Sequence, residues 1–351
     1  MGDTLSEPVL VALVGLVGGI LLGLAARIGR FCTLGAIEDL YYGENTLRLR
    51  MWGIAIGVAV IGTFGLNALG LLELGQTLYL SRAWNPAESI IGGLIFGYGM
   101  ALAGNCGYGA LARVGGGDLR SLLIVLIMGI SAYATLGGPL SDLRIWLFGG
   151  PEIAQGSQTF AHSLSYITGV PVSSAGMILG VAILCFTLSH HSLRHSFPHI
   201  FWGAIAGLAI VSGWAGTQWV ANTGFEATPV VSHTFSAPIG ETLLYVMTSS
   251  GNTIGFGTGS VLGVLLGALL GSLIKGHFRW EACEDPRELR RQMLGAALMG
   301  MGAVVAVGCS VGQGLSAFSV LSFSAPVTLA AIMTGAAIGL RQLIAGFSPN
   351  L

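Results

Sequence analysis

Three of the five cysteines lie among glycines, in stretches where an apolar run is interrupted. They are Cys32 in GRFCTLGAI, Cys106 in LAGNCGYGAL and Cys309 in GCSVGQGL. A thiol is a weak hydrogen-bond donor, and glycine lets the backbone leave helical geometry. The cysteines form no CxxC pair, so their spacing predicts neither a zinc site nor a redox dithiol. We therefore take these three cysteines as the candidate site and Cys185 and Cys283 as incidental.

The composition places these cysteines in a membrane protein. The chain has 351 residues, of which 53% are apolar and 9% charged, and its mean hydropathy is +0.78. Soluble domains carry roughly 25% charged residues. Strict apolar/polar alternation, the signature of a membrane barrel, is not found. The sequence predicts an all-α polytopic membrane protein, and a net charge of −1 gives no indication of a nucleic-acid partner.

The charge-free stretches predict about nine transmembrane helices, because roughly 20 helical residues cross a bilayer. The expected spans lie near 8–26, 51–72, 88–104, 121–137, 172–189, 200–220, 258–274, 291–307 and 326–345. We expect one transport domain over 1–351. It would consist of a first repeat over about 8–140 (spans 1–4), a connecting span over about 171–190 and a second repeat over about 200–345 (spans 6–9).

Basic residues predict the orientation of these spans. Thirteen of the fifteen Lys and Arg residues fall on one side of the membrane, and only Arg82 and Arg144 fall on the other. Positively charged loops stay in the cytoplasm. We therefore expect the N-terminus outside and the C-terminus in the cytoplasm.

Two stretches align without gaps at an offset of 203 residues. GGLIFGYGMALAGNCGYG (92–109) matches GAALMGMGAVVAVGCSVG (295–312), and Cys106 falls on Cys309. The two spans would cross the membrane in opposite directions. Inverted repeats of this kind are typical of transporters, whose substrate path lies at the repeat interface. The alternative is a pair of Gly-rich helices that merely pack closely through small residues.

Each of these two spans is too short to cross the bilayer before its cysteine. A helix over 89–103 extends about 22 Å, whereas the hydrocarbon core is about 30 Å thick. Non-helical backbone at that depth is tolerated only inside protein or beside a polar cavity. We expect Cys106 and Cys309 to lie close together, with short re-entrant central helices whose N-termini point inward and favour an anion.

Neutral hydrogen-bond donors around the breaks complete the predicted path. A fixed Lys or Arg would hold a dianion too tightly, whereas several weak donors allow entry and exit. We expect TSSGNTIGFGTG (248–259) to be the counterpart of the Cys32 segment in the second half. The predicted path donors are Gly104, Asn105, Gly107, Gly308, Ser310, Asn252, Thr253 and Gly255. The pattern suits a small sulfur-containing anion, with no metal and no cofactor.

Three blocks of the sequence resemble the YeeE/YedE sulfur-transport family. They are GRFCTLGAI, LAGNCGYGALARVGGGDLRSL and GCSVGQGLSAFSVLS, and the resemblance extends over essentially the whole chain. It implies uptake of thiosulfate across a bacterial inner membrane, with Cys32, Cys106 and Cys309 lining the path and Cys106 the most critical. It also implies two partners besides thiosulfate: the lipid bilayer and a small cytoplasmic sulfur-carrier protein of the TusA type.

Three other functions stay open at this point. The substrate could be another sulfur or selenium compound. The three cysteines could serve a membrane thiol–disulfide oxidoreductase, although such enzymes usually carry a CxxC pair. The chain could also be a neutral-solute channel in which the glycines serve only close packing. A transporter that is not an enzyme is the reading we prefer.

Overall fold

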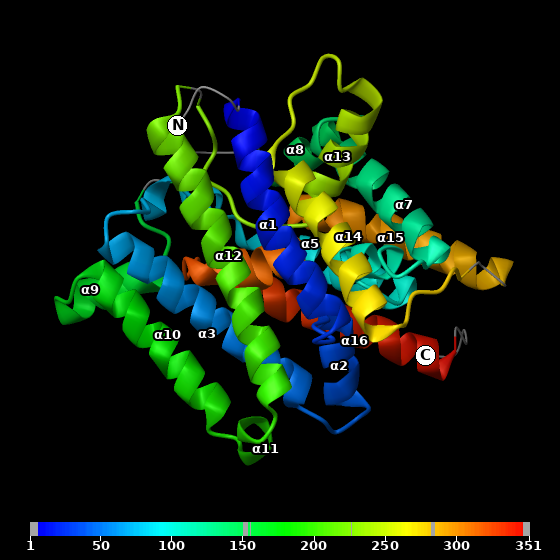
Figure 1. Ribbon diagram of the computed structural model, residues 1–351, viewed down its shortest axis with the longest axis horizontal. Helices are drawn as coiled ribbons and strands as arrows, with labels where there is room; N and C mark the ends of the chain where they lie inside the picture. The colour runs from blue at the N-terminus through cyan, green and yellow to red at the C-terminus, as the bar shows by residue number, and fades with distance from the viewer. Residues whose placement is uncertain (1–5, 150–153, 155, 226, 282–284, 347–351) are drawn as a thin grey trace.

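The computed structural model describes residues 6–149, 154, 156–225, 227–281 and 285–346. Cys283 lies outside these residues. Within them the regular structure is helical, with only isolated β-bridges such as Thr77–Val230. The prediction of an all-α fold is confirmed (Figure 1).

Nine described helices of 17 to 27 residues overlap the nine predicted spans. They are α1 Glu7–Arg27, α3 Leu47–Ala68, α5 Pro86–Ala103, α7 Leu119–Leu136, α10 Val172–Leu188, α12 Phe197–Thr223, α14 Phe256–Lys275, α15 Pro286–Val305 and α16 Ser324–Ala345.

Length and apolar composition qualify most of these helices as membrane spans. Seven helical segments of the described chain are long and apolar enough to cross a bilayer. The pair α9 (Phe160–Thr168) and α10 is bent by 112° and would make an eighth. Helix α15 begins with the charged sequence PRELRR, which lowers its mean hydropathy. The chain is a multi-pass membrane protein, and nine spans remain a prediction.

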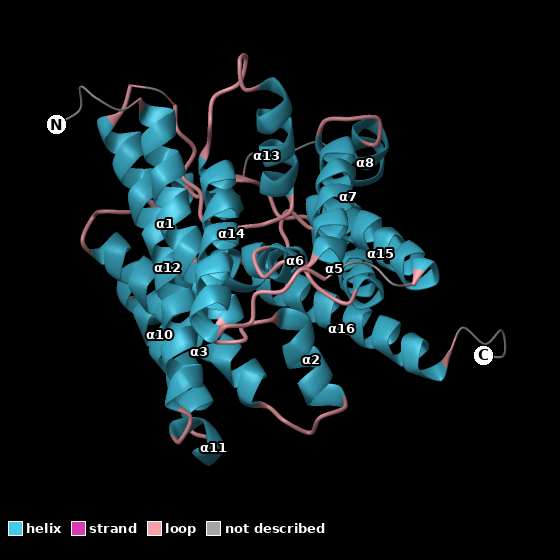
Figure 2. Cartoon of the chain, turned by 45° about the vertical axis from the view of Figure 1, so that its right-hand side comes forward, coloured by secondary structure: helices cyan, strands magenta, loops and turns pink. Residues whose placement is uncertain are grey.

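Shorter helices lie between the long ones. Three are central to the site: α2 Thr33–Tyr41, α6 Gly107–Val114 and α13 Ala237–Thr248, together with the π-helical turn η2 Gly312–Ala317. Figure 2 shows α6 near the middle of the molecule, between α14 and α5. The remaining short helices are η1 Leu74–Gln76, α4 Leu78–Ser81, α8 Ser141–Phe148 and α11 His191–Arg194.

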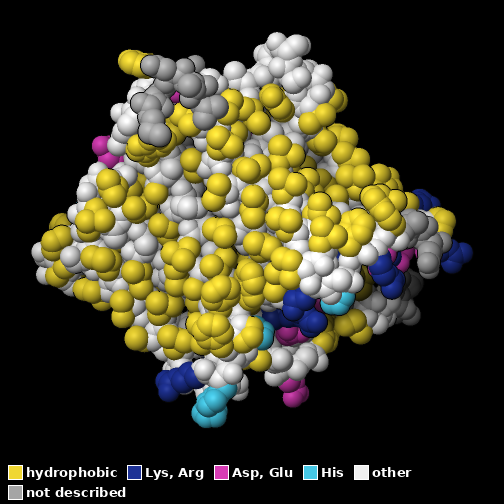
Figure 3. Space-filling view, viewed as in Figure 1, with side chains coloured by type: hydrophobic (Ala, Val, Ile, Leu, Met, Phe, Trp, Pro, Cys, Tyr) yellow, Lys and Arg dark blue, Asp and Glu magenta, His cyan; other side chains and the backbone are white. Residues whose placement is uncertain are grey.

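Small residues let the long helices pack closely. A Cβ on Gly97 in α5 would overlap the carbonyl oxygen of Ile332 in α16, and one on Gly15 in α1 would overlap that of Phe256 in α14. Close approach through glycine is a common way for helices to associate in membranes. Hydrophobic side chains cover the middle of the face in Figure 3, and most of the charged side chains lie toward its lower and right-hand edges. This distribution suits a lipid-facing surface.

The long helices pack against one another in pairs that are distant in the sequence. Helix α1 packs on α14, and α12 packs on α3. Helix α5 packs on α16, and α15 packs on α7. Helix α6 contacts α7, and η2 contacts α16.

Candidate functional site

Both helix breaks expected from the sequence are present. Helix α5 ends at Ala103, and Gly104 follows in the left-handed conformation with φ 71°. Helix α15 ends at Val305, and Val307 takes the equivalent left-handed conformation with φ 56°. Glycine accepts this conformation at no steric cost, whereas a β-branched residue rarely adopts it. Each break therefore turns the chain sharply just before its cysteine.

A cysteine follows each break and begins a new helical segment. Cys106 is the N-cap of α6, where its Sγ accepts a hydrogen bond from the Gly109 N–H at 3.3 Å. Cys309 precedes the helical turn at Ser310, and its Sγ accepts from the Gly312 N–H at 3.5 Å. The two thiols thus have the same local geometry, 203 residues apart.

Two further short helices begin at small polar residues. Cys32 is the N-cap of α2, and Ser236 is the N-cap of α13. Neither side chain makes a capping hydrogen bond. Three cysteines and one serine therefore stand at the starts of the four central helical segments.

Cys32 and Cys106 form one group with Asn105. The Cys32 Sγ lies 4.0 Å from Asn105 Oδ1, and the Cys106 backbone N–H donates to the same oxygen at 3.1 Å. Asn105 Oδ1 is occupied by these contacts, whereas the side-chain nitrogen Nδ2 is left for other partners.

Cys309 forms the second group with the extended segment before α13. The Phe235 N–H donates to Cys309 Sγ at 3.3 Å, and Thr234 Oγ1 lies 3.6 Å from the same sulfur. Two buried contacts hold this segment: Ser316 Oγ donates to the His233 carbonyl oxygen at 2.7 Å, and His233 Nδ1 lies 2.6 Å from Ser260 Oγ. The backbone at Phe235 therefore presents a fixed N–H to the thiol.

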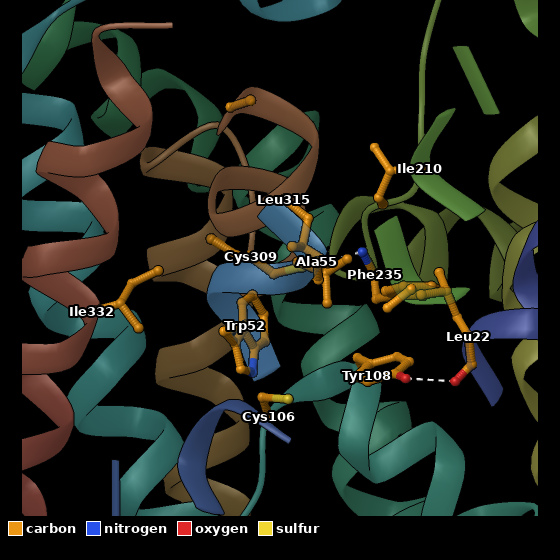
Figure 4. Close-up of a cluster of buried hydrophobic side chains, with 14 of the residues drawn as sticks. Leu22, Trp52, Ala55, Cys106, Tyr108, Ile210, Phe235, Cys309, Leu315 and Ile332 are labelled. Carbon is orange, nitrogen blue, oxygen red and sulfur yellow. Dashed lines mark hydrogen bonds between the residues drawn. The ribbon is translucent and has the colours of Figure 1, made fainter. Parts of the chain in front are cut away.

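Aromatic rings lie between the two groups. Phe31 stacks on Trp52 with centroids 4.6 Å apart, and Tyr108 and Phe235 lie 5.3 Å apart. Figure 4 shows Cys309 and Cys106 on opposite sides of the Trp52 ring in that view, and the Tyr108 Oη bonded to the Leu22 carbonyl oxygen at 2.6 Å. The Tyr108–Phe235 contact joins the residue two positions after Cys106 to the residue whose N–H donates to Cys309 Sγ.

Several buried hydrogen-bond donors near the cysteines have no partner within the described chain. All five side chains are at most 5% exposed: Thr33 Oγ1, Trp52 Nε1, Asn105 Nδ2, Ser236 Oγ and Ser310 Oγ. A buried donor without a partner costs about 1–3 kcal/mol, and most buried polar groups in proteins are satisfied. A concentration of unpaired donors therefore marks a place where an acceptor, water or a ligand, belongs.

A wide cavity of about 380 Å³ reaches one end of this centre. Cys32, Gly104 and Asn105 line it, and so do the side chains of four arginines and one glutamate, with His277. The charged lining residues are Arg27, Arg30, Arg48, Arg113 and Glu38. By the predicted orientation this wide cavity faces the cytoplasm, and it is strongly positive.

A narrow cavity of about 30 Å³ lies beside the second break. Its lining includes Val307, Gln313 and Ser324 on one side and Tyr79, Arg82, Trp84 and Glu88 on the other. Gln313 Nε2 donates to the carbonyl oxygens of Ala306 and Val307 at 2.8 and 3.2 Å, which holds the break in place. By the predicted orientation this narrow cavity faces outward.

The predicted path residues fall into two sets. Cys32, Asn105, Cys106, Cys309 and Ser310 come together at the centre as described, with Gly104 and Gly107 at the first break and Gly308 at the second. A Cβ on Gly107 would overlap Cε of the Met128 side chain and would lie in ordinary contact with the Phe235 carbonyl oxygen.

Asn252, Thr253 and Gly255 are not among the central residues. They lie on the exposed loop between α13 and α14, where they line a separate cavity of about 200 Å³ with Glu241 and Tyr245. The segment 248–259, predicted as the counterpart of the Cys32 segment, follows α13 instead of leading into it.

The segment that leads into α13 is 232–236, which the sequence-based prediction missed. Phe31 and Cys32 correspond to Phe235 and Ser236 at an offset of 204, almost the 203 of the cysteine repeat. At that offset, Phe235–Ser236 aligns with Phe31–Cys32. Serine replaces the cysteine, so a search for cysteine alone passes over it.

Broken helices, buried thiols and two separate cavities in a helical membrane protein are features expected of a transporter. The chain belongs to the sulphur transport family, whose model matches residues 28–338. This membership supports a transporter rather than the oxidoreductase considered above.

The chain is similar to curated transporters over most of its length. The thiosulfate transporter TsuA of Escherichia coli (strain K12) is 26% identical over 337 residues, covering 92% of this chain and 91% of that one. TsuA of Spirochaeta thermophila is 24% identical over 318 residues, covering 88% and 92%. A shorter match links the chain to the probable transporter YedE of E. coli, at 28% identity over 102 residues, or 29% of this chain and 24% of that one.

Proposed function

We propose that this protein takes up thiosulfate and passes it between the two cavities along Cys309, Cys106 and Cys32. The observation that carries this proposal is the set of unpaired buried donors around the thiols, from Asn105, Trp52, Thr33, Ser236 and Ser310. The relatives named as thiosulfate transporters support the choice of ion.

The chemistry of the centre suits an anion that must bind weakly and leave again. Hydroxyl, amide, indole and backbone N–H groups donate hydrogen bonds without a fixed positive charge. Soft thiols match the terminal sulfur of thiosulfate better than hydroxyl groups do. Binding at several weak sites permits conduction, because no single site traps the ion.

The distribution of charge supports uptake toward the wide cavity. Four arginines and one glutamate line that cavity, whereas the charged pair at the narrow cavity is neutral overall. An anion that leaves the neutral centre therefore meets a more positive potential on the wide side. The proposed location is the bacterial inner membrane, with the wide cavity and the C-terminus in the cytoplasm. A TusA-type sulfur carrier would receive the ion there.

The paired helix contacts support the proposed inverted repeat. Helices α1 and α14 pack as α12 and α3 do, which is the relation expected when α12 repeats α1 and α14 repeats α3. The same holds for α5 with α16 and α15 with α7. A path at the interface of two such halves is the usual transporter arrangement.

Uptake of ³⁵S-thiosulfate into a bacterial strain that lacks its own importers tests the function. Wild-type protein is expected to support uptake, and Cys106→Ala is expected to reduce the rate at least tenfold because it removes the thiol at the centre of the path. Cys185→Ala is the matched control, since this exposed cysteine lies in α10.

The amount of each variant in the membrane is measured by immunoblot so that rates compare equal protein. Uptake by Cys106→Ala at the wild-type rate would overturn the thiol path. No uptake by correctly inserted wild-type protein would overturn thiosulfate as the substrate. Competition by unlabelled selenium and sulfur anions then ranks the other substrates.

A further inference from the structure

The narrow cavity contains a buried ion pair. Arg82 Nη2 donates to both carboxylate oxygens of Glu88, at 2.9 and 2.8 Å. The side chains are 20% and 7% exposed, which makes this the most buried of the ion pairs found in the described chain. Arg82 is also one of only two basic residues expected on that side of the membrane.

The pair faces the break that leads to Cys309. Arg82 and Glu88 line one wall of the cavity, and Val307, Gln313 and Ser324 line the other. A volume of about 30 Å³ has room for roughly one or two water molecules, and none for an ion the size of thiosulfate. The path is therefore closed at this point, and an ion can enter only if the side chains of this wall move.

Stability does not explain the pair. Buried ion pairs contribute little to folding, because desolvation of both charges offsets their attraction, and apolar residues of similar volume often serve as well. Apolar side chains would also close the cavity. What the pair adds is a guanidinium group, whose planar fork of N–H donors matches the oxygen atoms of oxyanions.

The carboxylate of Glu88 occupies the same donors that an arriving oxyanion would use. A free guanidinium at the entrance would hold a dianion strongly and slow its passage. A guanidinium paired with Glu88 offers the ion an exchange instead: the ion gains Arg82 as the carboxylate leaves, and the returning carboxylate helps to expel it.

We propose that Arg82 is the first binding residue for the incoming dianion and that Glu88 competes with the dianion for it. The ligand class is a small tetrahedral oxyanion with two negative charges. This inference rests on the proposed function, because it concerns the entrance of the same path.

Four variants test the exchange by kinetics of ³⁵S-thiosulfate uptake at equal membrane expression: Arg82→Lys, Arg82→Gln, Glu88→Gln and the double variant Arg82→Gln/Glu88→Gln. Arg82→Gln is expected to raise KM about tenfold or more, because a charge-assisted hydrogen bond is lost. Glu88→Gln is expected to lower KM and also to lower kcat, since the competitor is gone and the ion leaves slowly. Arg82→Lys keeps the charge but loses the planar fork of donors, so its KM is expected to lie between those of the wild type and Arg82→Gln.

The double variant separates binding from a structural role. If the pair only holds the fold, removing both charges restores the wild-type KM, and the proposal is overturned. If Arg82 binds the ion, the double variant keeps the raised KM of Arg82→Gln. An unchanged or raised KM in Glu88→Gln would likewise contradict the competition. Failure of the wild-type protein to transport thiosulfate at all would instead refute the proposed function, independently of these ratios.

Discussion

At the scale of single residues, the centre depends on side chains whose hydrogen bonds are only partly used. Asn105 is the clearest case. Its Oδ1 accepts the Cys106 N–H and lies near the Cys32 thiol, while its buried Nδ2 has no partner in the described chain. The side chain thus orients two cysteines with one atom and offers a donor with the other.

Asn105→Asp is expected to lower the rate of thiosulfate uptake at least tenfold. The aspartate keeps the oxygen that accepts the Cys106 N–H, so local geometry is preserved, but it replaces the free donor with negative charge that repels the anion. Asn252→Asp is the matched control, because Asn252 lies on the exposed loop after α13. Equal uptake by the two variants, measured with radiolabelled thiosulfate, would show that Asn105 does not face the ion.

The sequence was enough to predict the types of residue that form the site, but not which hydrogen bonds they make. Glycines beside Cys106 and Cys309 predict both breaks, because glycine lets the backbone leave helical geometry. Non-helical backbone at membrane depth is tolerated only inside protein or beside a polar cavity. The donor role of Trp52 was missed, since a tryptophan in an apolar helix has the same pattern whether or not its indole N–H is bonded. Trp214, whose Nε1 donates to Ser319 Oγ at 2.8 Å, is the bonded example.

At the scale of elements, the long helices are positioned by glycine and the short ones by their caps. The length of the charge-free stretches was enough to predict the nine long helices, with ends that differ by at most five residues. The segment 232–236 escaped prediction because it is extended, short and polar. The Phe–Ser match at an offset of 204 is too short to identify it alone, and tertiary contacts such as the Phe235 N–H to Cys309 Sγ place it in the centre.

Gly97→Ala is expected to destabilise the protein by a few kcal/mol, because the new Cβ would overlap the backbone of α16 at Ile332 and force α5 away. Gly65→Ala, in α3, is the control. No other atom lies within 4 Å of a Cβ there, so this change is expected to be neutral or slightly stabilising through helix propensity. Thermal unfolding in detergent micelles measures both. A melting temperature of Gly97→Ala equal to that of Gly65→Ala would contradict close packing of α5 on α16.

At the scale of the whole molecule, access to the thiols is unequal. Cys32 lines the wide cavity, whereas Cys106 and Cys309 are 0% and 1% exposed. The centre is therefore open toward one side of the membrane and closed toward the other.

Single-cysteine variants in oriented membrane vesicles are expected to reflect this asymmetry. A membrane-impermeant maleimide should label Cys32 rapidly from the side of the wide cavity, and label Cys106 and Cys309 at least tenfold more slowly from either side. Labelling is measured by mass shift. The proposed orientation requires inside-out vesicles to give the fast reaction, and a fast reaction in right-side-out vesicles would reverse it.

The closed region between the wide cavity and the narrow cavity also sets where the membrane voltage acts. Where water fills the wide cavity, most of the potential falls across the buried region between the two cavities, from Asn105 on one side to Val307 on the other. A dianion that crosses this region inward moves against an inside-negative potential, at about 4–5 kcal/mol for every 100 mV. Most of the electrical work of uptake is thus done in the one step that crosses this region.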